Sequence, residues 1–179
     1  VGQACGTNAL AAVGSTGNLT NLVVNFYVGL STGASVVIAQ YYGAHNKDKI
    51  HQAVHTSYML AIVSGIIMML FGLFFSYQCL DAIGVPHDIL NDASLYMRLY
   101  FLGMIPGAIY NIGSGILRAV GDSKRPLYYL IICSIVNVVF DFVLVVILHK
   151  GIAGAAIATF IAQTVCAILV TIQLMFSKD

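Results

Sequence analysis

Charged residues are scarce in this sequence, and Glu and Trp are absent altogether. Only 8% of the residues are charged, against roughly 25% in soluble domains, while 59% are hydrophobic and the mean hydropathy is +0.90. A soluble chain of 179 residues needs more polar surface than this composition supplies, so the composition predicts a membrane protein. The net charge of +1 provides no basic surface, and we expect no nucleic-acid partner.

Two common enzyme signatures are absent from the sequence. It contains neither the H-E-x-x-H pattern of zinc proteases nor the G-x-x-x-x-G-K-[ST] pattern of nucleotide-binding loops. Its four cysteines show no C-x-x-C spacing, and we interpret them as small hydrophobic residues. We therefore predict that the protein is not an enzyme and needs no cofactor other than a coupling ion.

Five long apolar segments each have the length of about 20 residues that a helix needs to cross a bilayer. Short connections separate these segments, so successive helices are expected to be antiparallel neighbours. The expected fold class is all-α, a polytopic bundle of transmembrane helices that occupies residues 1–179. The five predicted spans are residues 18–42, 54–80, 94–120, 127–148 and 152–176.

The basic residues are unequally divided between the two ends of this predicted bundle. If the spans alternate in direction, only Arg98 and Lys150 lie at one end, and six basic residues lie at the other. Because Lys and Arg favour the cytoplasmic side, the basic end is predicted to be cytoplasmic, in a multi-pass protein of the inner (cytoplasmic) membrane. The six residues are Lys47, Lys49, Arg118, Lys124, Arg125 and Lys178.

Glycines and one proline give the spans local features. Gly29 and Gly33 form a G-x-x-x-G pattern, as do Gly103 and Gly107, and such patterns let membrane helices approach closely. Pro106 removes one backbone hydrogen bond and is predicted to kink the third span. The kink is interpreted either as a packing feature or as a hinge.

Asp141 is the one acidic residue that lies deep inside an apolar segment. A charged side chain at the centre of a membrane helix costs on the order of 2.5–3.5 kcal/mol on insertion scales. Such a residue usually faces a protein-lined or watery interior and carries an ion or a proton. We therefore predict that Asp141 takes part in ion coupling, whereas the structural alternative is that it only braces its neighbours.

Residue counting places three neutral polar residues near Asp141. Asn137 lies one turn before it, while Thr159 and Gln163 lie on the next span. Counting from a turn centred on Lys150, Asp141 and Thr159 both lie roughly 13 Å deep, and Asn137 and Gln163 lie one turn deeper. The count predicts Asp141 beside Thr159 and Asn137 beside Gln163.

These side chains suit a small cation. A carboxylate supplies charge, and amide and hydroxyl oxygens supply neutral ligands, so Asp141, Asn137 and Thr159 are the predicted cation-coupling residues. They are metal ligands only if the ion is Na⁺, because a proton would instead neutralise Asp141. The predicted cavity or substrate residues are Asn111, Ser114, Ser134 and Gln163, with helix packing as the alternative role of each.

Three stretches resemble the multidrug and toxic compound extrusion (MATE) family of transporters. Residues 29–44 have the pattern G-x-x-x-G-x-x-V-x-x-A-Q-Y-Y-G-A, which is similar to the family's second helix. Residues 117–126, L-R-A-V-G-D-S-K-R-P, resemble the loop between helices four and five. N-x-x-x-D at 137–141, followed by G-x-x-G-A-A-x-A-T at 151–159, is similar to helices five and six.

The resemblance implies a transporter of twelve helices in two six-helix lobes. Residues 1–179 would then be a partial N-terminal lobe, whose partners are the lipid bilayer, an organic substrate, and the missing first helix and second lobe of the same polypeptide. In the DinF-like branch, the family's cation site would carry over to Asn137, Asp141 and Thr159. An acidic residue of the missing first helix would complete it.

Three functions are weighed for the whole protein. The first is a secondary active antiporter that exports organic cations or drugs in exchange for Na⁺ or H⁺, in which Asp141 couples the two flows. The second is a flippase for lipid-linked oligosaccharides from the same superfamily, for which Arg98 and Arg118 lie too near span ends to provide a basic cavity. The third is a structural membrane module that transports nothing.

Overall fold

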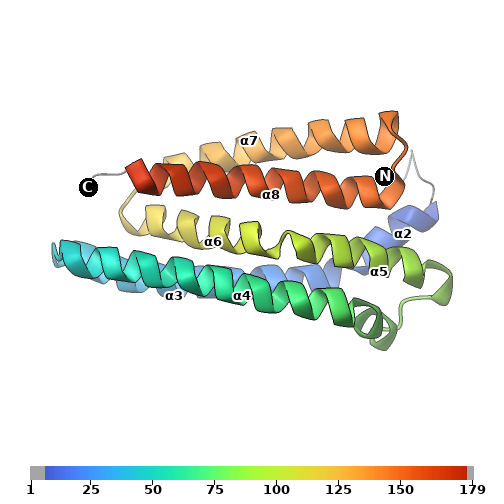
Figure 1. The fold of residues 1–179 in the computed structure, drawn as a ribbon, viewed down its shortest axis with the longest axis horizontal. Helices are drawn as coiled ribbons and strands as arrows, with labels where there is room; N and C mark the ends of the chain where they lie inside the picture. The colour runs from blue at the N-terminus through green and yellow to red at the C-terminus, as the bar shows by residue number, and fades with distance from the viewer. Residues whose placement is uncertain (1–6, 177–179) are drawn as a thin grey trace.

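The computed structural model describes residues 7–176, and all regular structure in this range is helical. The chain folds into long helices that lie side by side in an elongated bundle (Figure 1). The expected all-α fold class is confirmed. In chain order, the elements are α2 (Thr7–Ser15), α3 (Gly17–Gly43), α4 (Lys47–Ala82), α5 (His87–Leu102), α6 (Met104–Ala119), α7 (Lys124–Asp141), the π-helical segment η1 (Phe142–Ile147) and α8 (Gly151–Phe176).

Four continuous helices are long and apolar enough to cross a membrane: α3, α4, α7 with η1, and α8. A fifth crossing results if α5 and α6 are taken as one bent span. The α3–α4 and α6–α7 connections share one end of the bundle, and the α4–α5 and α7–α8 connections share the other (Figure 1). The helices therefore alternate in direction, as their short connections require.

The helix α4 begins at Lys47, well before the predicted start of this span at residue 54. Asn46 caps it, because the Asn46 side chain accepts a hydrogen bond of 3.1 Å from the backbone N–H of Lys49. Asp48 adds a negative charge to the first turn, where the helix dipole favours it. The helix thus extends beyond its apolar segment into the charged region that precedes it.

The third span is broken rather than smoothly kinked. The axes of α5 and α6 differ by 50°, and Gly103 separates the two helices. Pro106 is the third residue of α6, a position at which a helix needs no N–H donor. The predicted kink is therefore present, but the chain turns at Gly103 and Pro106 begins the new helix.

Close helix contacts in the bundle are made by glycines. A Cβ atom on Gly72 of α4 would overlap the ring of Phe101 in α5, and one on Gly113 of α6 would overlap Val170 of α8. Of the two predicted G-x-x-x-G patterns, only Gly103 and Gly107 pack against another helix. A Cβ on Gly29 or Gly33 would meet nothing within 4 Å, so the packing prediction is wrong for this pair within the described chain.

Large apolar side chains cover the outside of the bundle. Phe74 on α4 is 68% exposed and Val138 on α7 is 66% exposed. Apolar surface of this extent matches lipid tails rather than water. This apolar surface and the membrane-length helices together identify a multi-pass membrane protein.

Candidate functional site

Asp141 is the last residue of α7, at the junction with η1. Its side chain is half-buried, and its Oδ1 atom is buried without a hydrogen-bond donor among the residues that the structure describes. A buried carboxylate oxygen normally has a partner, because leaving one unpaired costs free energy. The location of this unpaired oxygen makes Asp141 the centre of the candidate site.

The backbone beyond Asp141 leaves the regular α-helical pattern. The N–H of Leu148 bonds to the carbonyl of Val143 at 2.9 Å, which is the i to i+5 spacing of a π-helix. Single π-helical turns occur often at functional sites, because they shift the side chains around them. The sequence shows only an apolar run here, and its residues carry no local signal for this turn.

Asn137 and Thr159 form the polar contact between α7 and α8. The Asn137 amide Nδ2 donates to Thr159 Oγ1 at 3.4 Å, and the Thr159 hydroxyl donates to the Ala155 carbonyl at 3.1 Å. The predicted alignment, with Asn137 beside Gln163, is one turn out of register. Two features of the structure shift the register. The turn between Ile147 and Gly151 is centred before Lys150, and residues of the wider π-turn advance less along the axis than α-helical residues do.

Gln163 lies elsewhere, at the break between α5 and α6. Its Oε1 atom occupies the position that a Cβ on Gly103 would take, and it lies 3.5 Å from the Cβ position of Gly107. This oxygen is buried and has no hydrogen-bond partner among the described residues. The side chain therefore fills the space that the two glycines leave, and it does not join Asn137.

The other three predicted cavity residues do not converge on Asp141. Asn111 donates from Nδ2 to the Gly107 carbonyl at 2.8 Å within α6. Ser114 is 1% exposed and its Oγ lacks a partner among the described residues. Ser134 is exposed on α7 and donates to the Leu130 carbonyl at 2.8 Å. The structure thus joins Asn137 to Thr159, one helical turn from Asp141 along α7, and no described hydrogen bond links a predicted cavity residue to any of these three.

Two residues near the hairpin are not apparent from the sequence. Tyr96 of α5 is half-buried and lies within electrostatic range of Asp141. Tyr129 of α7 donates its hydroxyl to Gln173 of α8 at 3.2 Å. Their positions depend on which helices pack together, so counting along one helix does not reveal them.

Cys133 of α7 and Cys166 of α8 are joined as a disulfide, with their Cα atoms 5.9 Å apart. The interpretation of these two cysteines as separate small hydrophobic residues is therefore wrong. The two residues are 33 positions apart in the sequence, and the packing of α7 against α8 brings them together. The link lies one turn from Asn137 and holds the two helices that carry the candidate site.

A serine motif that can mark a hydrolase nucleophile also occurs in the chain. Residues 29–33 read G-L-S-T-G, which matches the G-x-S-x-G pattern of a strand-to-helix elbow. Here the whole pattern lies within α3, and Ser31 is 2% exposed and donates to the Asn111 carbonyl at 2.6 Å. This serine links two helices and has neither the turn nor the access that a nucleophile requires.

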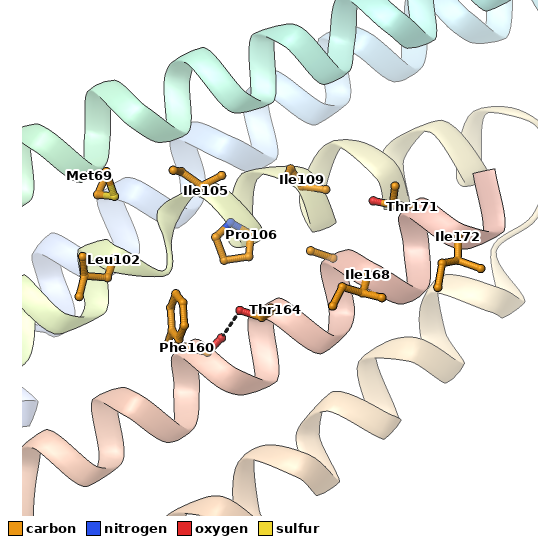
Figure 2. Close-up of a pocket in the computed structure, with 11 residues that line it drawn as sticks. Met69, Leu102, Ile105, Pro106, Ile109, Phe160, Thr164, Ile168, Thr171 and Ile172 are labelled. Carbon is orange, nitrogen blue, oxygen red and sulfur yellow. Dashed lines mark hydrogen bonds between the residues drawn. The ribbon is translucent and has the colours of Figure 1, made fainter. Parts of the chain in front are cut away.

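An apolar cavity of about 640 Å³ lies between α4, the α5–α6 break and α8 (Figure 2). Its two threonine hydroxyls are already engaged: Thr164 donates to the Phe160 carbonyl at 2.8 Å, and Thr171 lies 3.4 Å from the Tyr58 hydroxyl. The remaining lining is apolar. This cavity presents no charge for a cation and is suited to lipid tails.

The donor set around Asp141 fits a hard monovalent cation or a proton. Among residues 7–176, no group of three His, Cys, Asp or Glu side chains is positioned to hold a metal ion, which argues against a zinc-type centre there. Carboxylate, amide and hydroxyl oxygens are the ligands that hard cations prefer. The unpaired Oδ1 of Asp141 is the oxygen free to accept such an ion or a proton.

The fold and the sequence both match known transporters. Residues 1–143 match the family model MatE. The chain is 32% identical, over 99% of its length, to "Probable multidrug resistance protein YoeA" of Bacillus subtilis (strain 168) and spans 39% of that relative.

Two solved structures match most of the chain. One is described as MATE in the bent conformation, with a TM-score of 0.92, 27% identity and 97% of this chain covered. The other is an inward-facing multidrug resistance MATE family transporter of the MOP superfamily, with a TM-score of 0.91, 27% identity and 96% covered. The chain covers 39% of each of those structures. The agreement of family model, relative and fold shows that this protein belongs to the MatE family of membrane transporters.

Proposed function

We propose that the whole protein, of which this chain is a part, exports organic cations or drugs across the cytoplasmic membrane in exchange for Na⁺ or H⁺. The observation that carries the proposal is the buried, unpaired Oδ1 of Asp141 beside the Asn137–Thr159 contact. The relatives named as multidrug resistance proteins support the substrate class. A further helix and a second lobe of the same polypeptide would enclose the transport pathway.

The site's residues have distinct roles in this proposal. Asp141 supplies the charge that attracts the cation, and the Asn137 amide oxygen and Thr159 hydroxyl supply neutral oxygens. Asn137 now donates to Thr159, so it can rotate its amide oxygen toward an ion without disturbing the backbone. If H⁺ is the coupling ion, the same Oδ1 atom takes the proton and Asn137 orients the carboxyl group.

Coupling follows from the difference between the charged and neutralised states of Asp141. A bare carboxylate in an apolar helix pair is costly, so the charged state favours a conformation that opens the site to water. Ion or proton binding removes that cost and favours the occluded conformation. Substrate that binds the other conformation then shifts the same equilibrium in the opposite direction.

The direct test is substrate efflux by the full-length protein in proteoliposomes under an imposed Na⁺ or H⁺ gradient. Asp141→Asn keeps the shape of the side chain but removes its charge, and we expect it to abolish gradient-driven efflux. Asp81→Asn, on an exposed residue at the end of α4, is the matched control and should retain activity. Unchanged efflux by Asp141→Asn would rule out the coupling role.

A second variant distinguishes coupling to Na⁺ from coupling to H⁺. Thr159→Val removes one neutral oxygen and leaves the carboxylate intact. A Na⁺-coupled protein should require at least about tenfold more Na⁺ for half-maximal efflux, which corresponds to the loss of roughly 1.4 kcal/mol of binding. A proton-coupled protein should keep its dependence on the pH gradient. The flux of ²²Na⁺ and the flux of protons, reported by a pH-sensitive dye inside the same vesicles, distinguish the two results.

A further inference from the structure

A second groove lies between α3 and α4, near the end of the bundle where these helices join. Its volume is about 580 Å³. Most of its lining is small or apolar, including Gly29, Gly33 and Leu60, and Gln52, Thr56 and Ser57 add polar groups on the α4 side. None of these residues belongs to the α7–α8 site, so the groove needs a separate explanation.

The glycines keep the groove open. A Cβ atom on either Gly29 or Gly33 would meet no heavy atom within 4 Å, so no described residue packs on the face of α3 that these two glycines form. Glycine in a helix interior costs about 1 kcal/mol relative to alanine, and here no close contact in the described chain accounts for it. The two glycines instead leave an open groove along the helix.

The mouth of the groove is cationic. Lys49 lies at this end, with its Nζ atom 5.5 Å from the centre of the Tyr41 ring. The single ion pair among the described residues joins Arg125 to Asp122, so no carboxylate in that range neutralises Lys49. Of the adjacent charges, Lys47 is also positive and only Asp48 is negative. The mouth therefore presents an exposed ammonium group without an ion-pair partner, beside a mainly apolar groove.

We propose that this groove binds one anionic phospholipid of the cytoplasmic leaflet. The headgroup phosphate pairs with Lys49, and one acyl chain lies along Gly29, Gly33 and Leu60. Basic residues immediately cytoplasmic of a transmembrane helix attract anionic lipids, and the distribution of basic residues predicts that this end is cytoplasmic. A protein helix seated on the glycines would fill the groove but would leave the Lys49 ammonium unpaired.

The test uses the full-length protein in phosphatidylcholine nanodiscs that contain a minor fraction of phosphatidylglycerol with a photoactivatable acyl chain. After illumination, mass spectrometry should locate the label on residues 29–60. Unlabelled phosphatidylglycerol should displace the probe, and phosphatidylcholine should not. Lys49→Gln should reduce labelling about fivefold, the effect of about 1 kcal/mol for one basic residue near the membrane surface.

Two further variants test the apolar half and provide a control. Gly33→Leu should remove labelling in this region, because its side chain would occupy the groove, and the helix accepts leucine more readily than glycine. Lys150→Gln removes a positive charge from the α7–α8 connection, which lies at the opposite end of the bundle (Figure 1), and should leave labelling unchanged. Thermal unfolding of each variant shows whether the fold is retained.

Three results would overturn the proposal. One is equal labelling of residues 29–60 by the phosphatidylglycerol and phosphatidylcholine probes. Another is labelling by the phosphatidylglycerol probe that Lys49→Gln does not change. The third is no labelling of this region, which would mean that a helix of the second lobe, or a second copy of the protein, covers the groove.

Discussion

Asp141 carries the one ionisable group among the three buried polar atoms that lack a partner in the described chain; the other two are the neutral Ser114 Oγ and Gln163 Oε1. Ser31, Asn111 and Ser134 each donate to a backbone carbonyl, so their polarity is satisfied inside the helices. Asp141 has a buried oxygen with no donor among residues 7–176. An unpaired ionisable group costs more to bury than an unpaired neutral one, so its retention favours a role in transport over one in packing.

A stability measurement on Asp141→Asn should separate these roles. The amide is neutral and cheaper to hold in an apolar helix than a carboxylate, and no described hydrogen bond to the buried Oδ1 is lost. We expect the melting temperature of the full-length protein in detergent to be unchanged or higher. Asn137→Leu, which loses a hydrogen bond to Thr159, is the comparison and should melt lower. A clearly lower melting temperature for Asp141→Asn would show that the carboxylate braces the helices.

The helix elements were largely predictable, whereas their irregularities were not. Runs of apolar residues identified the four membrane-length helices and the bent α5–α6 pair, which makes a fifth crossing if it is one span, because length and hydropathy alone identify such helices. The exact position of the break, at Gly103, and the π-helical segment after Asp141 do not follow from the runs of apolar residues. The same holds for Gln163, whose position against the glycines depends on the bend and not on its spacing along α8.

The fit of Gln163 to the α5–α6 break leads to a double-mutant prediction. Gly103→Ala places a methyl group on the Gln163 Oε1 atom, so we expect the variant to unfold at a lower temperature. Gln163→Ala removes that clash, and in the Gly103→Ala background it should restore part of the lost stability. The expected coupling energy between the two sites is about 0.5–3 kcal/mol.

The control for this cycle is Gly29→Ala, whose new Cβ meets no heavy atom within 4 Å. That variant should be neutral or slightly stabilising, because alanine favours helix more than glycine does. Thermal melts of the four proteins of the cycle give the coupling. Strict additivity of the two substitutions would contradict the contact between Gln163 and Gly103.

For the whole molecule, the placement of charges and the alternation of the helices agree. Lys47, Lys49, Lys124 and Arg125 lie at the end that carries the α3–α4 and α6–α7 connections, and Lys150 lies at the other (Figure 1). Counting the spans along the sequence predicted how the basic residues divide between the two ends, because each crossing reverses the side on which the next loop emerges. Which end faces the cytoplasm remains a prediction from the positive-inside bias.

Cysteine labelling tests that orientation in the full-length protein. Lys49→Cys should react with a membrane-impermeant maleimide only in inside-out vesicles, because it lies at the predicted cytoplasmic end. Lys150→Cys, on the opposite connection, should react only in intact cells. The unsubstituted protein gives the background from its own cysteines. The reverse pattern would invert the topology and place the Lys49 groove in the outer leaflet.

The attachment of α7 has a mechanical consequence. This helix packs mainly on α8, to which it is also joined by the Cys133–Cys166 disulfide and by Asn137 and Tyr129, whereas its contact with α6 is slight. Within the described chain, a force that arises at Asp141 therefore reaches the other helices chiefly by way of α8. Asp141 therefore lies on a helix that one neighbour holds in place, so a change in its charge can move α7 and α8 together.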